Sequence, residues 1–277
     1  MTIDAELAAA HGELLRQYDA MQQGGGERAA DAVATQLALL KLMLTERELL
    51  FPALPQTPDE VDALVVARGV FEIGTLFSIH QKDTSAFDRY WSQLKPFYLD
   101  VGDHIPRSAN YEPLVGLSLL RLLSSNQISA FHMALETLPA DLVRDSKYIH
   151  HPVLLERWLM EGSYSNVWRE RESVPREEFR FFVDKLMVTI REEIARCEEK
   201  AYASLPLKDV ATLLFFDHLP EVLEFAKERG WHVSPTIETI EFSTKNASDE
   251  NDEQELVPMR STITSNLRFA RELESIV

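Results

Sequence analysis

The sequence is poor in cysteine, in basic residues and in long apolar runs, and each shortage excludes a class of protein. A single cysteine among 277 residues excludes internal disulfides and metal clusters built from thiolates. The sequence contains 28 Lys and Arg residues and 45 Asp and Glu residues, which gives a formal net charge of −17. Such a charge disfavours nonspecific binding to nucleic acid or to anionic membranes.

Membrane insertion and secretion are disfavoured as well. The best apolar run, LALLKLML at residues 37–44, is interrupted by Lys41 and falls short of the roughly 20 residues that span a bilayer. The first thirty residues lack the basic flank and apolar core of a secretory signal. We therefore expect a soluble, intracellular protein.

The sequence also lacks the patterns that usually mark a catalytic or metal site. It contains no HExxH, no GxSxG and no glycine-rich phosphate loop. The adjacent His150 and His151 point apart on a helix, so they cannot chelate one metal together. The acidic pairs at 192–193 and 198–199 are expected on a solvated helix face. We predict no enzymatic activity, no catalytic residue, no metal and no cofactor.

Helical periodicity dominates what is present, and it predicts a mostly α fold. Residues 3–22 and 28–51 carry apolar residues at helical spacing, and a further helix is expected to end near His80. That helix begins with a hydroxyl cap at Thr57, a proline at the first position and two acids in the first turn, all of which favour a helix start.

Three short segments form a weak internal repeat. Thr84-Ser85-Ala86-Phe87, Ile128-Ser129-Ala130-Phe131 and Tyr164-Ser165-Asn166-Val167 each follow an apolar helix and a polar turn. Their first residues are separated by 44 and then by 36 positions, a spacing typical of helix-turn-helix solenoids. We predict an N-terminal helical (TPR-like) repeat array over residues 1–174, with a non-repetitive helical bundle as the alternative.

One long helix is expected next, over residues 175–202. Its apolar residues recur at steps of three and four, which places them on one stripe of the helix. The stripe consists of Phe179, Val183, Leu186, Ile190, Ile194, Cys197 and Ala201. The cysteine is therefore expected to be buried as a packing residue rather than exposed as a reactive thiol.

The pattern changes after the long helix and predicts a winged helix within residues 175–242. A short extended segment at 204–207 is followed by two helices, the second with a glycine C-cap at Gly230. Two strands are then expected at 231–233 and 237–242. The second of the two helices, residues 220–230, carries three Glu against one Lys and one Arg. A net acidic element does not suit a DNA groove, so protein binding is favoured over nucleic-acid binding.

Two further segments close the chain. Residues 243–258 are rich in acids and poor in apolar residues, which predicts a flexible linker. Residues 259–277 predict a terminal helix whose apolar side covers about half of the helical wheel. A lone surface helix would not leave that much apolar area in water without a partner.

Several strings in the second half of the chain resemble the PCI-domain family. They include YIHHPVLLERWLMEGSYSNVW, FFVDKLMVTIREEIARCEEKAY and ARELESIV, which are similar to segments of the non-ATPase regulatory subunits of the 26S proteasome lid. The resemblance is strong over 114–242 and 267–277, and weaker over the first hundred residues. It implies helical repeats that lead through a long helix into a winged helix, followed by a C-terminal helix.

The resemblance also implies a function. It predicts a non-catalytic scaffold subunit of the proteasome lid that supports ubiquitin-dependent protein degradation in cytoplasm and nucleus. The alternatives are a PCI subunit of the signalosome or of the translation initiation factor three complex, or a nucleic-acid-binding winged helix.

PCI subunits of this kind associate through the sheet edges of their winged helices and through a bundle of C-terminal helices. The implied partners are therefore other PCI subunits of the lid, with no nucleic acid and no membrane. The residues predicted to contact them are Trp231, Val233, Ile237, Ile240, Phe242, Ile263, Leu267, Phe269, Ala270, Leu273, Ile276 and Val277.

Overall fold

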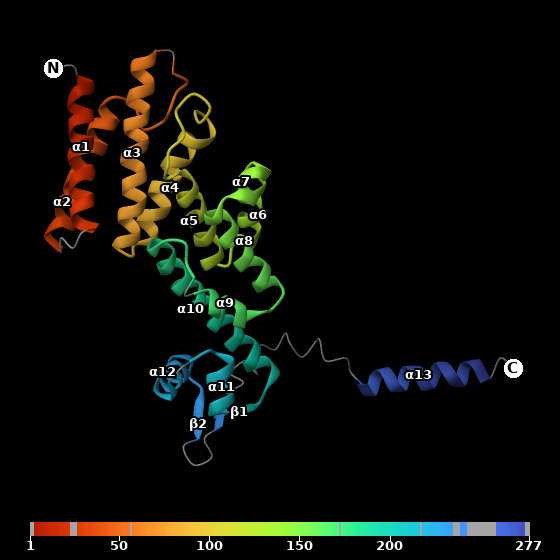
Figure 1. Ribbon diagram of the computed structural model, residues 1–277. Helices are drawn as coiled ribbons and strands as arrows, with labels where there is room; N and C mark the ends of the chain where they lie inside the picture. Colours follow the sequence, from red (N-terminus) through yellow and green to blue (C-terminus); the bar gives the residue numbers. More distant parts are fainter. Residues whose placement is uncertain are drawn as a thin grey trace. The chain divides into compact units, whose positions relative to one another are not determined.

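The computed structural model describes residues 3–22, 27–55, 57–171, 173–216, 218–234, 239–242 and 259–274. These residues form thirteen helices and three short strands, which confirms the predicted mostly α fold (Figure 1). The chain divides into two compact units, residues 1–190 and residues 191–277. The acidic linker predicted at 243–258 lies outside the described residues.

The first unit is built from helices that pack in neighbouring pairs. Helix α1 packs on α2, α3 on α4, α5 on both α6 and α8, and α8 on α9. The helices are α1 (Ile3–Gln22), α2 (Glu27–Glu46), α3 (Pro58–His80), α4 (Thr84–Leu99), α5 (Tyr111–Ser124), α6 (Ile128–Glu136), α7 (Ala140–Asp145), α8 (Lys147–Met160), α9 (Tyr164–Glu170) and α10 (Glu177–Ala201).

Helix α3 packs against α1, α2 and α4. By length and composition it could cross a membrane, contrary to the expectation that no apolar run is long enough, but it is mostly buried inside the unit as a core helix. Its close packing against α4 requires a glycine, because a Cβ on Gly74 would lie 2.4 Å from the ring of Tyr90. A buried ion pair between Arg68 and Glu72, 3.3 Å apart, is completed by the Tyr98 hydroxyl, which donates to Glu72 at 2.9 Å.

The three copies of the sequence repeat occupy equivalent positions in the structure. Their first residues, Thr84, Ile128 and Tyr164, are the first residues of α4, α6 and α9. The fourth residue of each copy is a large apolar side chain that is fully buried: these are Phe87, Phe131 and Val167. The repeat therefore marks the start of the second helix in each pair and the residue that anchors it.

The turns before these helices share one backbone conformation. Lys82, Asn126 and Gly162 all have positive φ, at 57°, 57° and 70°. In each turn the positive-φ residue donates its N–H to the carbonyl three positions back, and the next residue donates to the carbonyl five positions back. This is the Schellman arrangement, which satisfies the last carbonyls of a helix. Only glycine adopts the conformation without a steric cost.

Helix α10 contributes to both units, and its buried positions change phase along its length. In the first unit it buries Phe179, Phe182, Val183, Leu186, Met187 and Ile190. Beyond that point the predicted stripe is wrong: Cys197 is exposed, Ala201 is exposed, and Ala195 and Glu198 are buried instead. A shift of one residue turns the buried face by about 100°, because the later residues pack against a different core.

The second unit holds a small antiparallel sheet with helices. After α10 come β1 (Ser204–Pro206), α11 (Leu207–Leu213), α12 (Leu219–Arg229), β2 (His232–Ser234), β3 (Thr239–Glu241) and α13 (Met259–Glu274). The strand order is β1-β3-β2. Leu205 pairs with Ile240 on one side of β3 and Val233 pairs with it on the other. This α/β unit has the element order that the sequence predicts for a winged helix.

The positive-φ residues generate a stability prediction. Glu48, in the turn that follows α2, has the same backbone conformation, with φ 58°. Its side chain is exposed. Glu48→Gly is expected to raise the free energy of unfolding by about 0.5–1 kcal/mol, because the Cβ clash is removed. Urea unfolding measures the change. Glu48→Ala removes the same charge but keeps a Cβ, so a gain of equal size in that variant would contradict the explanation.

Candidate protein-interaction surfaces

The α/β unit is organised around one buried tryptophan. The Trp231 ring meets Phe225 and Phe242 edge-on, with centroids 5.6 Å and 5.0 Å apart. Its Nε1 donates a hydrogen bond of 2.8 Å to a carboxylate oxygen of Glu199 on α10. Val210, Leu214, Val222, Ala226 and Ile240 complete the core around it. The aromatic and aliphatic side chains thus fix the sheet to α11 and α12.

Two arginines attach α10 to the rest of this unit. Arg191 donates to the carbonyls of Leu214 and Phe215 at 3.0 and 2.9 Å, which satisfies acceptors left at the end of α11. Arg229, at the end of α12, donates to the backbone carbonyl of Glu192 at 2.9 Å. These bonds hold both helices of the α/β unit against the second half of α10.

Of the two strands that the sequence predicts at the sheet edge, β2 is an outer strand and β3 is not. Residues 231–233 and 237–242 were expected to supply the free edge, but β3 is the central strand and has a neighbour on each side. Within the described residues, β1 and β2 are therefore the outer strands. A partner strand would have to pair with one of these two, because the backbone groups of β3 are already engaged.

The predicted contact residues of the sheet mostly face inward. Trp231, Ile240 and Phe242 are buried in the core, and Val233 on β2 is partly exposed. Ile237 lies outside the described residues. Val233 packs against the same core, so a partner at the β2 edge would meet chiefly its backbone, and the role of the predicted residues in binding stays a prediction.

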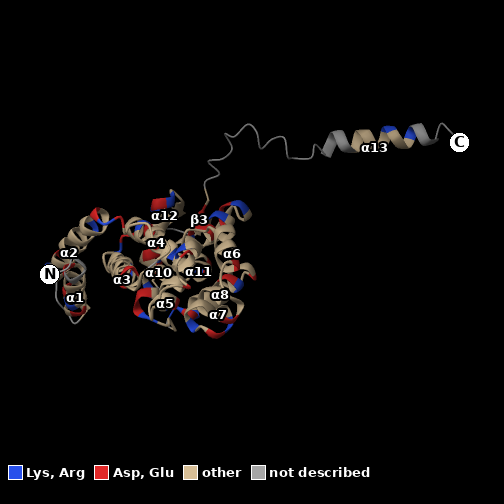
Figure 2. Ribbon diagram, turned by 90° about the horizontal axis from the view of Figure 1, so that it is seen from above, with Lys and Arg blue, Asp and Glu red and all other residues tan. Residues whose placement is uncertain are grey.

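Helix α12 is acidic, as the sequence indicates (Figure 2). The helix carries three acidic residues, Glu221, Glu224 and Glu228, and two basic ones, Lys227 and Arg229. Arg229 is already paired with Glu199, 3.4 Å away. The helix that would enter a nucleic-acid groove in this type of fold therefore offers little free positive charge to phosphate.

Helix α13 presents apolar side chains to water. Ile263, Leu267 and Phe269 are 58%, 61% and 62% exposed, and Ala270 is exposed too. Leu273 lies within the bounds of α13, whereas Ile276 and Val277 fall outside the described residues. Large side chains exposed at this spacing are typical of a helix that packs against a partner.

Two buried titratable residues were not predicted from the sequence. Glu198 was expected on a solvated face, yet it is 5% exposed, and neither carboxylate oxygen has a hydrogen-bond partner among the described residues. Burial, with the neighbouring charge of Glu199, raises the pKa of Glu198 to about 7. Burial lowers the pKa of His151 to about 4, and its ring packs edge-on against Phe179. His151 is thus a neutral core residue of α8.

No group of three His, Cys, Asp or Glu side chains that could hold a metal ion occurs in the described parts of the chain. The chemistry available at the surfaces described above is that of protein contacts: backbone at a strand edge, and apolar side chains on a helix.

The fold is that of a mostly helical PCI-type protein, and comparison with known proteins gives its family. The model of the CSN8/PSMD8/EIF3K family matches residues 109–251, from the loop before α5 to beyond β3. The chain belongs to the CSN8/PSMD8/EIF3K family. The predicted resemblance to PCI-domain proteins is thereby confirmed.

Individual relatives extend the match over almost the whole chain. The chain is 33% identical over 267 residues to the 26S proteasome non-ATPase regulatory subunit 8 homolog A of Arabidopsis thaliana, covering 96% of this chain and 98% of the relative. It is 35% identical over 260 residues to the 26S proteasome regulatory subunit rpn12 of Schizosaccharomyces pombe, covering 89% and 93%. It is 31% identical over 271 residues to subunit 8 of Caenorhabditis elegans, covering 98% and 100%.

The burial of Glu198 generates a pH prediction. Its pKa of about 7 in the folded chain lies above the unfolded value, so the folded state binds more protons between roughly pH 4.5 and 7. Stability from this group therefore falls as pH rises through that window. Glu198→Gln is expected to raise the free energy of unfolding by on the order of 1–3 kcal/mol at pH 8, and by little at pH 4.5.

Urea unfolding at the two pH values measures the effect of this substitution. Glu192→Gln is the matched control, because it removes the same charge from an exposed position of the same helix. An equal gain from Glu198→Gln at both pH values would show that the carboxylate is not the source of the effect.

Proposed function

We propose that this chain is a non-catalytic subunit of the lid of the 26S proteasome regulatory particle. In that role it supports lid assembly and, through it, ubiquitin-dependent protein degradation. The observation that carries the proposal is the set of relatives named as 26S proteasome regulatory subunits, which are 31–35% identical over nearly their full lengths. Cytoplasm and nucleus are the proposed locations.

The family description also includes CSN8 and EIF3K, so a place in the signalosome or in the initiation factor three complex is the alternative. Full-length similarity to relatives that all carry proteasome names favours the lid. The acidic α12 disfavours a nucleic-acid-binding role.

Two surfaces support a scaffold role. The outer strand β2 is proposed to extend the sheet of a neighbouring PCI subunit, since an unpaired strand edge readily accepts another strand. The apolar side of α13 is proposed to enter a bundle with the terminal helices of neighbouring subunits. In this arrangement residues 1–174 form the repeat domain, 175–242 the PCI domain, 243–258 a linker and 259–277 the bundle helix.

Affinity purification of the tagged full chain, followed by mass spectrometry, tests the proposal. Recovery of the proteasome lid subunits is the expected result. Recovery of signalosome or initiation factor three subunits in their place would establish the alternative, and recovery of neither would contradict a role in these assemblies.

The exposure of α13 generates a further prediction. Deleting residues 259–277 is expected to leave the unfolding temperature of the remaining chain almost unchanged, because the described side chains 263–271 are exposed. The same deletion is expected to lower recovery of lid subunits at least roughly tenfold, since apolar anchors carry much of the binding energy of such interfaces.

A pair of neighbouring substitutions sharpens this test. Leu267→Glu is expected to reproduce most of the loss, because it places a charge among apolar contacts. Asn266→Glu adds a charge to an adjacent exposed position and is expected to change recovery less than roughly twofold. Equal effects of the two variants would mean that the apolar side of α13 does not make the contact.

A further inference from the structure

A basic groove lies on the first unit, and none of its lining residues belongs to the strands or to α13. Its volume is about 630 Å³. Helix α10 lines it with Arg180, Phe181, Asp184, Lys185 and Val188, and the turn between α3 and α4 adds Lys82. The α10 residues recur at steps of three and four, so they form one stripe of the helix. That stripe is distinct from the one that buries Phe179, Phe182 and Val183 in the core.

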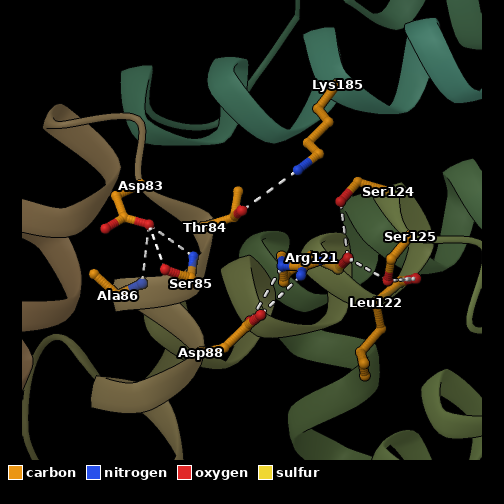
Figure 3. Close-up of polar contacts among 10 residues, drawn as sticks. All are labelled: Asp83, Thr84, Ser85, Ala86, Asp88, Arg121, Leu122, Ser124, Ser125 and Lys185. Atoms are coloured by element: carbon orange, nitrogen blue, oxygen red, sulfur yellow. Dashed lines mark hydrogen bonds and ion pairs between the residues drawn. The ribbon is translucent and has the colours of Figure 1, made fainter.

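The positively charged side chains of the groove take little part in ion pairs among the described residues. In the described residues, Lys82 and Arg180 make no ion pair, and Lys185 only reaches the hydroxyl of Thr84 at 3.5 Å (Figure 3). The acid Asp184 is already engaged, because Arg171 donates to it at 2.8 Å. Glu177 is the other acid in the lining, so the groove carries net positive charge on a chain whose total is −17.

The nearby Asp83 is negatively charged, but among the described residues it makes no ion pair with these cations. One of its carboxylate oxygens accepts from the backbone N–H groups of Ser85 and Ala86 at 2.9 and 3.1 Å, and from the Ser85 hydroxyl at 2.8 Å (Figure 3). These bonds lower the pKa of Asp83 and turn the carboxylate toward the first turn of α4. It serves as the helix cap.

The groove also offers two apolar contacts at helical spacing. Val188 is 51% exposed and Phe181 is partly exposed. Seven residues separate them, which is about two turns or roughly 10.5 Å along α10. Two apolar contacts at this distance, with cations on both sides, match one face of an amphipathic helix laid along α10. The cations require that helix to be acidic.

We propose that this groove is a docking site for an acidic amphipathic helix of another protein. The partner would place two apolar residues, about seven positions apart, on Phe181 and Val188. Its carboxylates would pair with Lys82, Arg180 and Lys185. A nucleic acid is the less favoured occupant, because a few cations on a chain of charge −17 give phosphate little net attraction. The proposal goes beyond the lid role, which uses the β2 edge and α13.

Site-specific photo-cross-linking in the native assembly tests the groove. The full chain is expressed in its own cells with p-benzoylphenylalanine in place of Val188, or in place of the exposed Lys200 of the same helix as a control. Cross-linked peptides are then sequenced. The expected product at position 188 is a net acidic partner segment with apolar residues at helical spacing, absent from the control at position 200.

A charge reversal provides the second arm. Arg180→Glu, combined with the cross-linker at 188, is expected to lower the cross-link yield at least roughly fivefold, because it places like charges together. Lys200→Glu makes the same change of charge elsewhere on α10 and is expected to alter the yield less than roughly twofold. Both replaced side chains are exposed, and circular dichroism checks that each variant retains its helix content.

Other outcomes overturn the proposal. A cross-link to nucleic acid, a cross-link to a basic segment, or no product above the control would each do so. Recovery of lid subunits without a product at 188 rejects the groove but keeps the lid role. A cross-link to an acidic helix of a protein outside the proteasome keeps the groove and leaves the lid role to be decided by the purification.

Discussion

The burial of apolar side chains along α10 is the constraint on which much of the structure depends. In the first unit, Phe182 meets Phe87 of α4 with ring centroids 5.1 Å apart, and Phe179 meets Tyr148 and His151 of α8. Thr189 adds a hydrogen bond of 2.9 Å to the backbone at Ser124, the end of α5. Helix α10 thereby contacts α4, α5 and α8, which belong to different helix pairs of the first unit. Its second half, from Arg191 onward, then belongs to the core of the α/β unit.

The second half of α10 has a different chemical task, and its residues differ accordingly. Small and polar side chains replace the large apolar ones: Ala195 packs in the core, and Glu199 binds the Trp231 ring nitrogen. Glu198 is buried, and in the described parts of the chain its carboxylate has no hydrogen-bond partner to offset the loss of hydration. A buried carboxylate without a hydrogen bond is destabilising when ionised. Its neighbourhood is thus a weak point of the unit at neutral and alkaline pH.

Local signals predicted the elements well, and long-range contacts account for what they missed. The cap, proline and acids at 57–60 correctly predicted the start of α3, and Gly230 ends α12 with φ 74° as expected. The error at Cys197 arose because a stripe was extended past Ile190, where the packing partners change. The pairing of β3 with β1, a segment about 35 residues earlier, could not be predicted, because no local pattern reports such a pairing. The apolar side of α13 could be predicted from the sequence, because it depends only on the spacing of residues within one helix.

Apolar and charged surfaces contribute differently to the assembly of such a chain. An exposed apolar helix such as α13 supplies affinity, but it discriminates poorly, because many amphipathic helices satisfy the same contacts. A compact group of cations on a strongly acidic protein would add selectivity if it bound the proposed acidic helix. The rest of the surface, being acidic, would repel other acidic segments. A partner that used both proposed surfaces would have to match an apolar helix and a group of cations, and that combined requirement would be stricter than either alone.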